Sequence, residues 1–261
     1  MARKQNPIRS DIAWSNRERI VVRGKDLPSE VIGHMNLGDF AFLQLTGRTA
    51  TPDQSRLFNA ILVTLVEHGL TPSAIAARLT YAGAPESMQA AVAAGLCGLG
   101  SVFVGSMEGA ARLLYEALPK GTTGADLPSL ARDIVARERA AKRILPGMGH
   151  PIHKPVDPRA PRLFALAAEC GMAGDYTRLI QLVAEEAERV SGKSLPVNAT
   201  GAIGAICCEF GFPVAAVRGF GVMARAVGLV GHILEESERP MAQEIWLRTE
   251  DEASAHMRPP G

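Results

Sequence analysis

GMGHPIHKPVDPR, residues 147–159, is the most informative stretch of the sequence. Its two glycines let the backbone approach a ligand closely, and His150, His153, Lys154 and Arg159 follow within the same segment. A loop that combines backbone freedom with several cationic side chains suits a polyanionic ligand. By composition alone, an ordinary linker between two helices with solvated charges fits these residues equally well.

Helical patterns lie on both sides of this segment and indicate the fold class. In residues 54–69 apolar side chains recur at helical spacing, with Thr51 and Pro52 starting the helix and Gly69 ending it. Only ERIVVR, residues 18–23, has the β-branched pattern of a strand. We therefore predict an all-α fold, with further helices over residues 72–80, 87–99, 106–118, 127–143, 158–170, 175–190, 199–210 and 222–236.

Composition and charge exclude several classes of partner. The 261 residues are 47% hydrophobic, enough to bury a core in one or two domains. Lys and Arg (28) nearly balance Asp and Glu (27), so no overall field attracts nucleic acid or an anionic membrane. The opening MARKQNPIRSDIAW lacks the apolar region of a signal peptide, and charges interrupt the longest apolar stretches. We expect a cytoplasmic protein that binds neither nucleic acid nor membranes.

The four cysteines show no functional spacing. Cys97, Cys170, Cys207 and Cys208 match neither a metal-ligand pattern nor a disulfide framework, and each lies among small helical residues. We predict buried thiols in a reducing compartment and no metal site.

Small residues crowd two of the predicted helices. The stretches are AAVAAGLCGLG before Ser101 and ATGAIGAICC after Asn198. Both permit close helix approach, either inside one protomer or at a subunit interface, and the sequence does not separate the two.

Three motifs in order carry a family resemblance. G-x-G-H, followed nine residues after His150 by the Arg of D-P-R, resembles the signature of citrate synthases. VEHGLTPSA at residues 66–74 resembles their H-G segment before a Ser-Ala helix, and ARAVGLVGHILEE at 224–236 resembles their late R-x-x-G-x-x-x-H segment. The resemblance spans residues 66–236 and extends to citryl-CoA lyase and the C-terminal module of ATP-citrate lyase, which the short chain resembles most.

The resemblance implies an architecture and a set of ligands. The expected fold is a large helical domain from residues 1–103 and 212–261, with a smaller helical domain, 104–211, inserted. Relatives of this kind act on a coenzyme A thioester and a di- or tricarboxylic acid without a tightly bound cofactor. They are dimeric, so a homodimer or higher homo-oligomer is expected.

The resemblance also assigns roles to individual residues. Arg159 and Arg225 match the arginines that bind carboxylates, for which a planar guanidinium fork is well suited, and Arg239 resembles one contributed across the dimer. His150 matches the histidine that holds the oxaloacetate carbonyl, and His68 matches a second substrate-binding histidine, although a histidine at a helix end also satisfies the last carbonyls. The expected coenzyme A contacts are Pro146, Gly147, Met148, Gly149 and Lys154, and Asn198 is expected to contact substrate.

Two positions depart from the citrate synthase pattern. Phe103, in GSVFVG, stands where synthases have the histidine that stabilises the thioester enol, which favours a lyase-like relative with Phe103 beside the substrate. Thr200 stands where the family has its catalytic aspartate, and an alkyl hydroxyl is too weak a base to remove an α-proton unaided. Either Thr200 holds a water relay, or Glu108 or His232 carries the proton, or the protein binds without turnover.

These observations favour cleavage of a citryl-CoA-like substrate into acetyl-CoA and oxaloacetate. The alternatives are a citrate- or methylcitrate-forming condensation of an acyl-CoA with an oxoacid, and a non-catalytic protein that binds coenzyme A esters.

Overall fold

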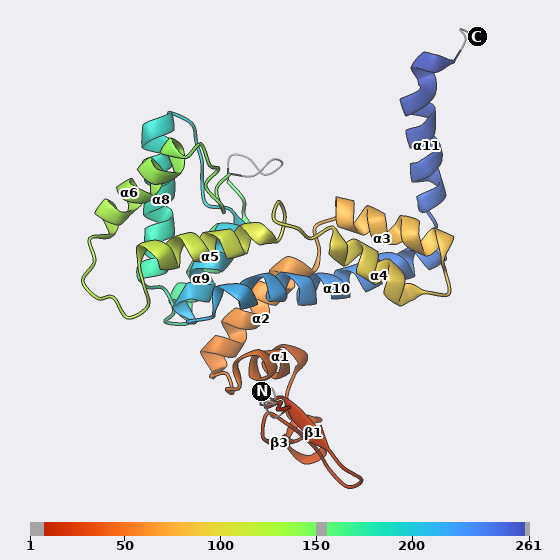
Figure 1. Cartoon of the computed structure of the whole chain (residues 1–261), viewed down its shortest axis with the longest axis horizontal. Helices are drawn as coiled ribbons and strands as arrows, with labels where there is room; N and C mark the ends of the chain where they lie inside the picture. The colour runs from red at the N-terminus through yellow and green to blue at the C-terminus, as the bar shows by residue number, and fades with distance from the viewer. Residues whose placement is uncertain (1–7, 150–155, 259–261) are drawn as a thin grey trace, which may run out of the picture. The chain divides into compact units, whose positions relative to one another are not determined.

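The computed structural model describes residues 8–149 and 156–258, and the chain divides into two compact units, residues 1–60 and 61–261 (Figure 1). Each unit is described by itself. The expected large and small domains follow a different division, which stays a prediction.

The first unit pairs a small sheet with helical segments. Strands β1 (Ala13–Ser15), β2 (Ile20–Val22) and β3 (Lys25–Asp26) form an antiparallel sheet in the order β1-β2-β3, which confirms the strand expected in residues 18–23. A π-helical turn η1 (Leu27–Val31) and helix α1 (Leu37–Thr46) follow, and α2 (Pro52–Val66) begins in this unit. Phe42 of α1 and Phe58 of α2 meet edge to face, with ring centroids 5.4 Å apart, and form its core.

The second unit is helical, and every helix expected in it is confirmed. The sequence prediction differs from the structure in one boundary and one helix: α10 starts at Val214 rather than at residue 222, and α11 was not predicted. The helices after α2 are α3 (Pro72–Gly83), α4 (Met88–Cys97), α5 (Gly105–Ala117), α6 (Leu127–Ala140), α7 (Arg159–Glu169), α8 (Asp175–Ser191), α9 (Ala199–Glu209), α10 (Val214–Glu238) and α11 (Ala242–Ser254), with a final 3-10 turn η2 (Ala255–Met257).

Helix α9 is the buried centre of one part of this unit, with α5, α7 and α8 packed around it (Figure 1). Ala202, Ile203 and Ile206 have no exposed surface. A methyl group on Gly204 would lie 2.8 Å from the Cβ of Ala110 on α5, so the small residues allow close packing within the protomer.

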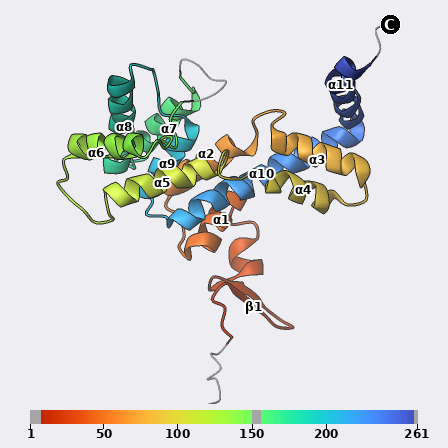
Figure 2. The ribbon, with the colours of Figure 1, turned by 45° about the horizontal axis from the view of Figure 1, so that its top comes forward.

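Helix α10 joins this part to the pair α3 and α4, which pack against it (Figure 2). Gly95 of α4 lies against Leu229 of α10, where an added Cβ would come within 2.7 Å of the leucine. The small residues around Gly95 therefore also serve packing inside the protomer.

By length and composition, α10 is a helix that a membrane could accommodate, as are the core helices of many water-soluble proteins. It contacts α3, α4 and α5 and carries Arg225, His232 and two buried or half-buried glutamates. The expectation that the protein does not bind membranes stays a prediction.

One expectation about the cysteines is wrong. Cys170, Cys207 and Cys208 are buried as predicted, but Cys97, the last residue of α4, is exposed. All four are free thiols. Burial raises the pKa of Cys207 and, to about 12, that of Cys208, which makes both unreactive.

Candidate active site

The glycine loop before residue 150 is held against the segment that leads into α9. Met148 pairs with Val197 in an isolated antiparallel bridge, the Gly149 N–H donates to the Pro196 carbonyl at 2.8 Å, and the Asn198 N–H donates to the Gly147 carbonyl at 3.0 Å. Gly147 has φ +81°, and a Cβ on it would lie 2.9 Å from the Gly201 nitrogen. Only glycine fits there. The predicted coenzyme A loop is therefore fixed by backbone bonds.

Asn198 connects this loop to α9. Its Oδ1 accepts hydrogen bonds from the N–H groups of Thr200 and Gly201 at 3.0 and 3.1 Å, which makes it the N-cap of the helix. Its Nδ2 donates to the Gly149 carbonyl at 2.5 Å. Thr200 donates its hydroxyl proton to the same Oδ1 at 2.6 Å. The side chain of Asn198 is thus engaged in hydrogen bonds within the protein. The Thr200 hydroxyl, at the position predicted to match the family's catalytic aspartate, is also already hydrogen-bonded.

Arg159 is aimed by a buried carboxylate. Asp157, 1% exposed, accepts two bonds from the Arg159 guanidinium at 3.0 and 2.9 Å and one from the Ala199 N–H at 3.0 Å. Burial alone would raise the pKa of Asp157, but these bonds lower it to about 2. The pair stays ionised at neutral pH and ties the start of α7 to the start of α9.

Arg225 is the most unusual group of the site. Its Nε and Nη1 are buried, and no atom within residues 8–149 or 156–258 accepts a hydrogen bond from them. Burial and the positive charge of Arg159 lower the pKa of Arg225, while the negative charge of Glu67 opposes them. A buried donor without an acceptor costs about 1–3 kcal/mol, so such a guanidinium is prepared for an anionic ligand.

The turn that carries His68 lies beside this arginine. Glu67 Oε1 accepts the N–H groups of His68 and Gly69, both at 2.7 Å, and Gly69 has φ +74°. Burial works to raise the pKa of Glu67, yet bonds from His68, His232 and Gly69 hold it below its usual value. The structure therefore gathers the predicted residues Arg159 and Arg225 with Glu67, which sequence reasoning missed.

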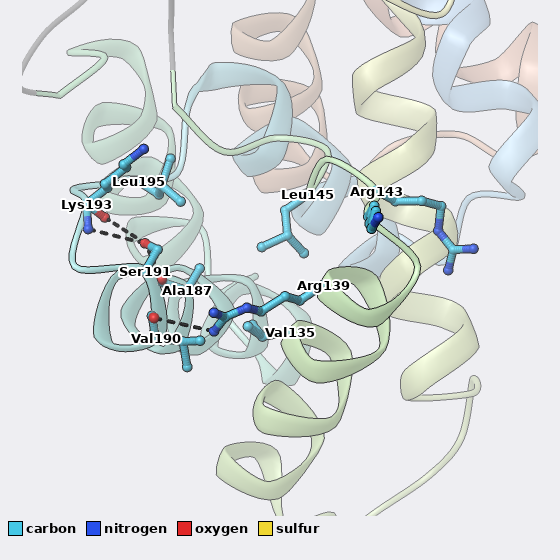
Figure 3. A pocket seen from close by; sticks show the side chains of 10 residues that line it. Val135, Arg139, Arg143, Leu145, Ala187, Val190, Ser191, Lys193 and Leu195 are labelled. Atoms are coloured by element: carbon cyan, nitrogen blue, oxygen red, sulfur yellow. Dashed lines mark hydrogen bonds between the residues drawn. The ribbon is translucent and has the colours of Figure 1, made fainter.

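A basic pocket of about 420 Å³ lies between α6, α8 and the stretches that follow each helix (Figure 3). Leu145 and Leu195, which continue into the glycine loop and its partner segment, line it with Val135, Ala187 and Val190. Its charged lining is entirely cationic: Arg139, Lys142, Arg143 and Lys193.

The cations of this pocket were also missed from the sequence. The signal was present as the cluster ARERAAKR directly before the glycine loop. Arg143 is anchored by Glu138, whose pKa the arginine lowers to about 2 against the opposing effect of burial. Lys142 has φ +53°, a left-handed conformation that ends α6.

The remaining site residues have varied surroundings. His150 and Lys154 lie outside the described residues. Phe103 is 47% exposed in the turn before α5, and Arg239 is exposed after α10, with Nη2 3.8 Å from Glu235. Their predicted roles stay predictions.

The two alternative proton carriers are both engaged. Glu108 is held between Arg112 at 2.7 Å and Arg218 at 2.6 Å. His232 has both ring nitrogens in contact with charged side chains, Arg78 and Glu67. This geometry supports neither as a free acid or base. Within the described ranges, no cluster of three His, Cys, Asp or Glu side chains is placed to hold a metal ion.

Comparison with known proteins agrees with this geometry. The family model of the citrate synthase C-terminal domain matches residues 24–247. The chain belongs to the citrate synthase family. Among solved structures, citryl-CoA lyase from Hydrogenobacter thermophilus superimposes with a TM-score of 0.79 at 33% identity, covering 88% of this chain and 87% of that one. Citrate synthase from Thermotoga maritima superimposes with a TM-score of 0.64 at 21% identity, covering 78% and 55%.

Longer members of the citrate synthase family contain the same fold as a part. ATP citrate lyase from Methanothrix soehngenii, in complex with citrate and coenzyme A, matches with a TM-score of 0.74 at 22% identity, covering 91% of this chain and 40% of that one. The probable ATP-citrate synthases of Caenorhabditis elegans and Dictyostelium discoideum are 22% and 23% identical over 91% and 90% of this chain. The chain spans only 22% and 39% of their lengths.

Proposed function

We propose that this protein is a citryl-CoA lyase, which cleaves a citryl-CoA-like thioester into acetyl-CoA and oxaloacetate. The observation that carries the proposal is the pair of buried Arg225 nitrogens, Nε and Nη1, which have no acceptor among the described residues and lie within the electrostatic reach of Arg159. The 33% identical relative that matches over nearly its whole length bears the same activity in its name.

The two arginines supply a site for the carboxylates of the citryl group. Arg159 presents a guanidinium oriented by Asp157, and Arg225 presents two donors that have no acceptor among the described residues. Each charge-assisted bond to a carboxylate contributes about 1.5–3 kcal/mol. Binding of citrate-like acids follows from this pair.

The basic pocket and the glycine loop supply a site for the coenzyme A end. Cationic side chains at the rim suit phosphates, and the apolar floor between α6 and α8 suits an adenine or pantetheine surface (Figure 3). The loop between residues 145 and 149 presents backbone to the same region, held by Asn198.

The reaction breaks the bond between the hydroxyl-bearing carbon and the methylene carbon next to the thioester. The hydroxyl loses its proton and becomes the ketone of oxaloacetate, and the bonding electron pair passes to the thioester as an enolate. The enolate then takes up one proton to give acetyl-CoA. We assign the contact with the reacting oxygen to His150 by the family resemblance.

The proton for the enolate cannot come directly from Thr200 in the arrangement described, because its hydroxyl proton is donated to Asn198. A water that donates to a lone pair of Thr200 Oγ1 remains compatible with this geometry. We expect a slow lyase for this reason.

The test is release of oxaloacetate from synthetic citryl-CoA by the purified protein, followed by NADH oxidation with malate dehydrogenase. We expect release that is lost in Arg225→Ala and retained in Arg162→Ala, an exposed arginine of α7 paired with Glu169. No release by the wild-type protein under conditions where it binds citryl-CoA overturns the proposal.

That last outcome supports a second candidate, a protein that binds coenzyme A esters without turnover. The observation in its favour is the engagement of Thr200 by Asn198, together with the absence of a carboxylate at that position.

We also propose a cytoplasmic homo-oligomer, with Arg239 as a contribution to the neighbouring site. The exposure of Arg239 supports this.

A further inference from the structure

A chain of bonded charged groups runs from the His68 turn to the start of α11. Glu67 accepts the backbone N–H groups of His68 and Gly69, and His232 Nε2 lies 3.1 Å from both of its oxygens. On the other side of the ring, Arg78 donates to His232 Nδ1 through Nε at 3.2 Å and Nη2 at 2.9 Å. Arg78 has no exposed surface.

The far end of the chain is also fully bonded. Arg78 Nη1 donates to Glu236 at 2.9 Å and Nη2 to Glu235. The second oxygen of Glu236, a residue 4% exposed, accepts the N–H groups of Met241 and Ala242 and so caps α11. Arg78 therefore cannot move toward another acceptor without breaking buried bonds.

This arrangement fixes the protonation of His232. A guanidinium has donors only, so Nδ1 facing Arg78 must be the unprotonated nitrogen. The ring is then neutral, and its proton is on Nε2, where it is donated to Glu67.

The backbone also places the turn close to α10. A Cβ on Gly228 would clash with the Val66 carbonyl and come within 2.9 Å of Glu67 Oε2. Gly228 lies between Arg225 and His232 on the same helix, so the glutamate that holds the turn sits beside the unpartnered guanidinium.

We propose that Glu67 and His232 are positioning residues of the active site, which fix the His68 turn relative to Arg225. The inference rests on the proposed function for its kinetic consequences. The charged groups that face His232 are Glu67 at the end of α2, Arg78 of α3, and Glu235 and Glu236 of its own helix.

Two variants of His232 distinguish a role in positioning the His68 turn from a role in the stability of the folded protein alone. His232→Gln retains an N–H at the place of Nε2, and so the bond to Glu67, but removes the acceptor for Arg78. His232→Asn retains an acceptor at the place of Nδ1 for Arg78 but loses Glu67. His232→Gln leaves the N–H groups that the fully buried Arg78 donates to His232 without an acceptor. If His232 had a purely structural role, His232→Gln would therefore lower both stability and activity more than His232→Asn does.

If His232 has a positioning role, the order of the two variants is reversed for the KM, so that His232→Asn is the more impaired. We expect His232→Asn to raise the KM for citryl-CoA about tenfold with little change in kcat, the effect of losing one charge-assisted bond that holds the turn. His232→Gln keeps a KM near that of the wild type, despite its lower urea midpoint. Glu238→Gln, which changes an exposed glutamate on α10, is the control variant and should leave the KM unchanged.

Hydrogen exchange tests the inference without turnover. The His68 and Gly69 amides donate hydrogen bonds to Glu67. In the full-length protein, we expect these two amides to exchange faster in the His232→Asn variant than in the wild type, and at the wild-type rate in the His232→Gln variant. A wild-type protein that does not cleave citryl-CoA refutes the proposed function and leaves this readout intact. Unchanged exchange in His232→Asn, or a KM raised more in His232→Gln than in His232→Asn, overturns the inference.

Discussion

Replacing Arg225 by methionine should stabilise the free protein while destroying its ligand site. Two guanidinium nitrogens are buried without an acceptor among the described residues, and burial already lowers the pKa of the group. Methionine keeps a long apolar side chain in the same space and removes the unsatisfied donors. The change therefore separates the requirements of folding from those of binding.

The magnitude follows from the bonds that are missing. Each unsatisfied buried donor costs about 1–3 kcal/mol, and the attraction to the half-exposed Glu67 returns at most about 1 kcal/mol. We expect the free energy of unfolding of Arg225→Met to rise by at least about 1 kcal/mol. Loss of two charge-assisted bonds should weaken citrate binding by about 3–5 kcal/mol, a factor of at least about a hundred.

The assay combines urea unfolding with calorimetric titration of citrate or citryl-CoA. Arg162→Met removes an exposed arginine with a surface ion pair and should change neither quantity by more than about 0.5 kcal/mol. If Arg225→Met unfolds at lower urea than the wild type while citrate binding persists, Arg225 is a structural residue and the reasoning is wrong.

Three further predictions concern the loop, the acid limit and the missing carboxylate. Gly201→Ala forces its methyl group against the Gly147 carbonyl and should weaken coenzyme A binding at least about tenfold, as measured by calorimetry. The control is Gly204→Ala, whose methyl group would press against α5 instead, and which should lower stability with little effect on coenzyme A binding. The pKa of Asp157 is lowered to about 2, so its stabilisation is present above its unfolded pKa of about 3.9 and lost as the pH falls toward 2. Acid unfolding of Asp157→Asn, followed by circular dichroism, should therefore be less steep in that range, and an equally steep curve counts against the assignment. Thr200→Asp should raise the rate of citryl-CoA cleavage at least about tenfold by supplying a proton carrier, and no increase at any pH would exclude proton supply as the limit.

The fold was predictable from the sequence where helical periodicity was uninterrupted. Helices α2 to α9 lie within a few residues of their predicted bounds, because their apolar stripes and caps are local signals. The first turns of α10 were missed because Gly219 and Gly221 interrupt the pattern, although Gly221 is required where α10 meets Val104. That requirement comes from a partner distant in sequence and leaves no periodic trace.

The site was predictable only as far as motifs reached. Arg159, Arg225 and the glycine loop were singled out by the family resemblance of their motifs, and the structure brings them to adjoining parts of one unit. Glu67 and Asp157 were overlooked because a carboxylate that orients a cation has no signature until its partner is known. The basic pocket was overlooked because its cations come from α6, the stretch after α6 and the stretch after α8, which are distant in sequence.

Thr200, which is predicted to stand at the position of the family's catalytic aspartate, is hydrogen-bonded to the rest of the site through Asn198. This side chain caps α9, clamps Gly149 and accepts the Thr200 hydroxyl, so the position is linked to the loop expected to bind coenzyme A. An aspartate at residue 200 would place a negative charge against Asn198 Oδ1 and would have to release that contact to reach substrate. With threonine at residue 200 there is no carboxylate to carry a proton, but the hydrogen bond to Asn198, which holds the Gly149 carbonyl, is kept. If Arg159 and Arg225 bind carboxylates as proposed, the site combines these binding groups with a position that lacks a carboxylate base, so binding and turnover must be measured separately.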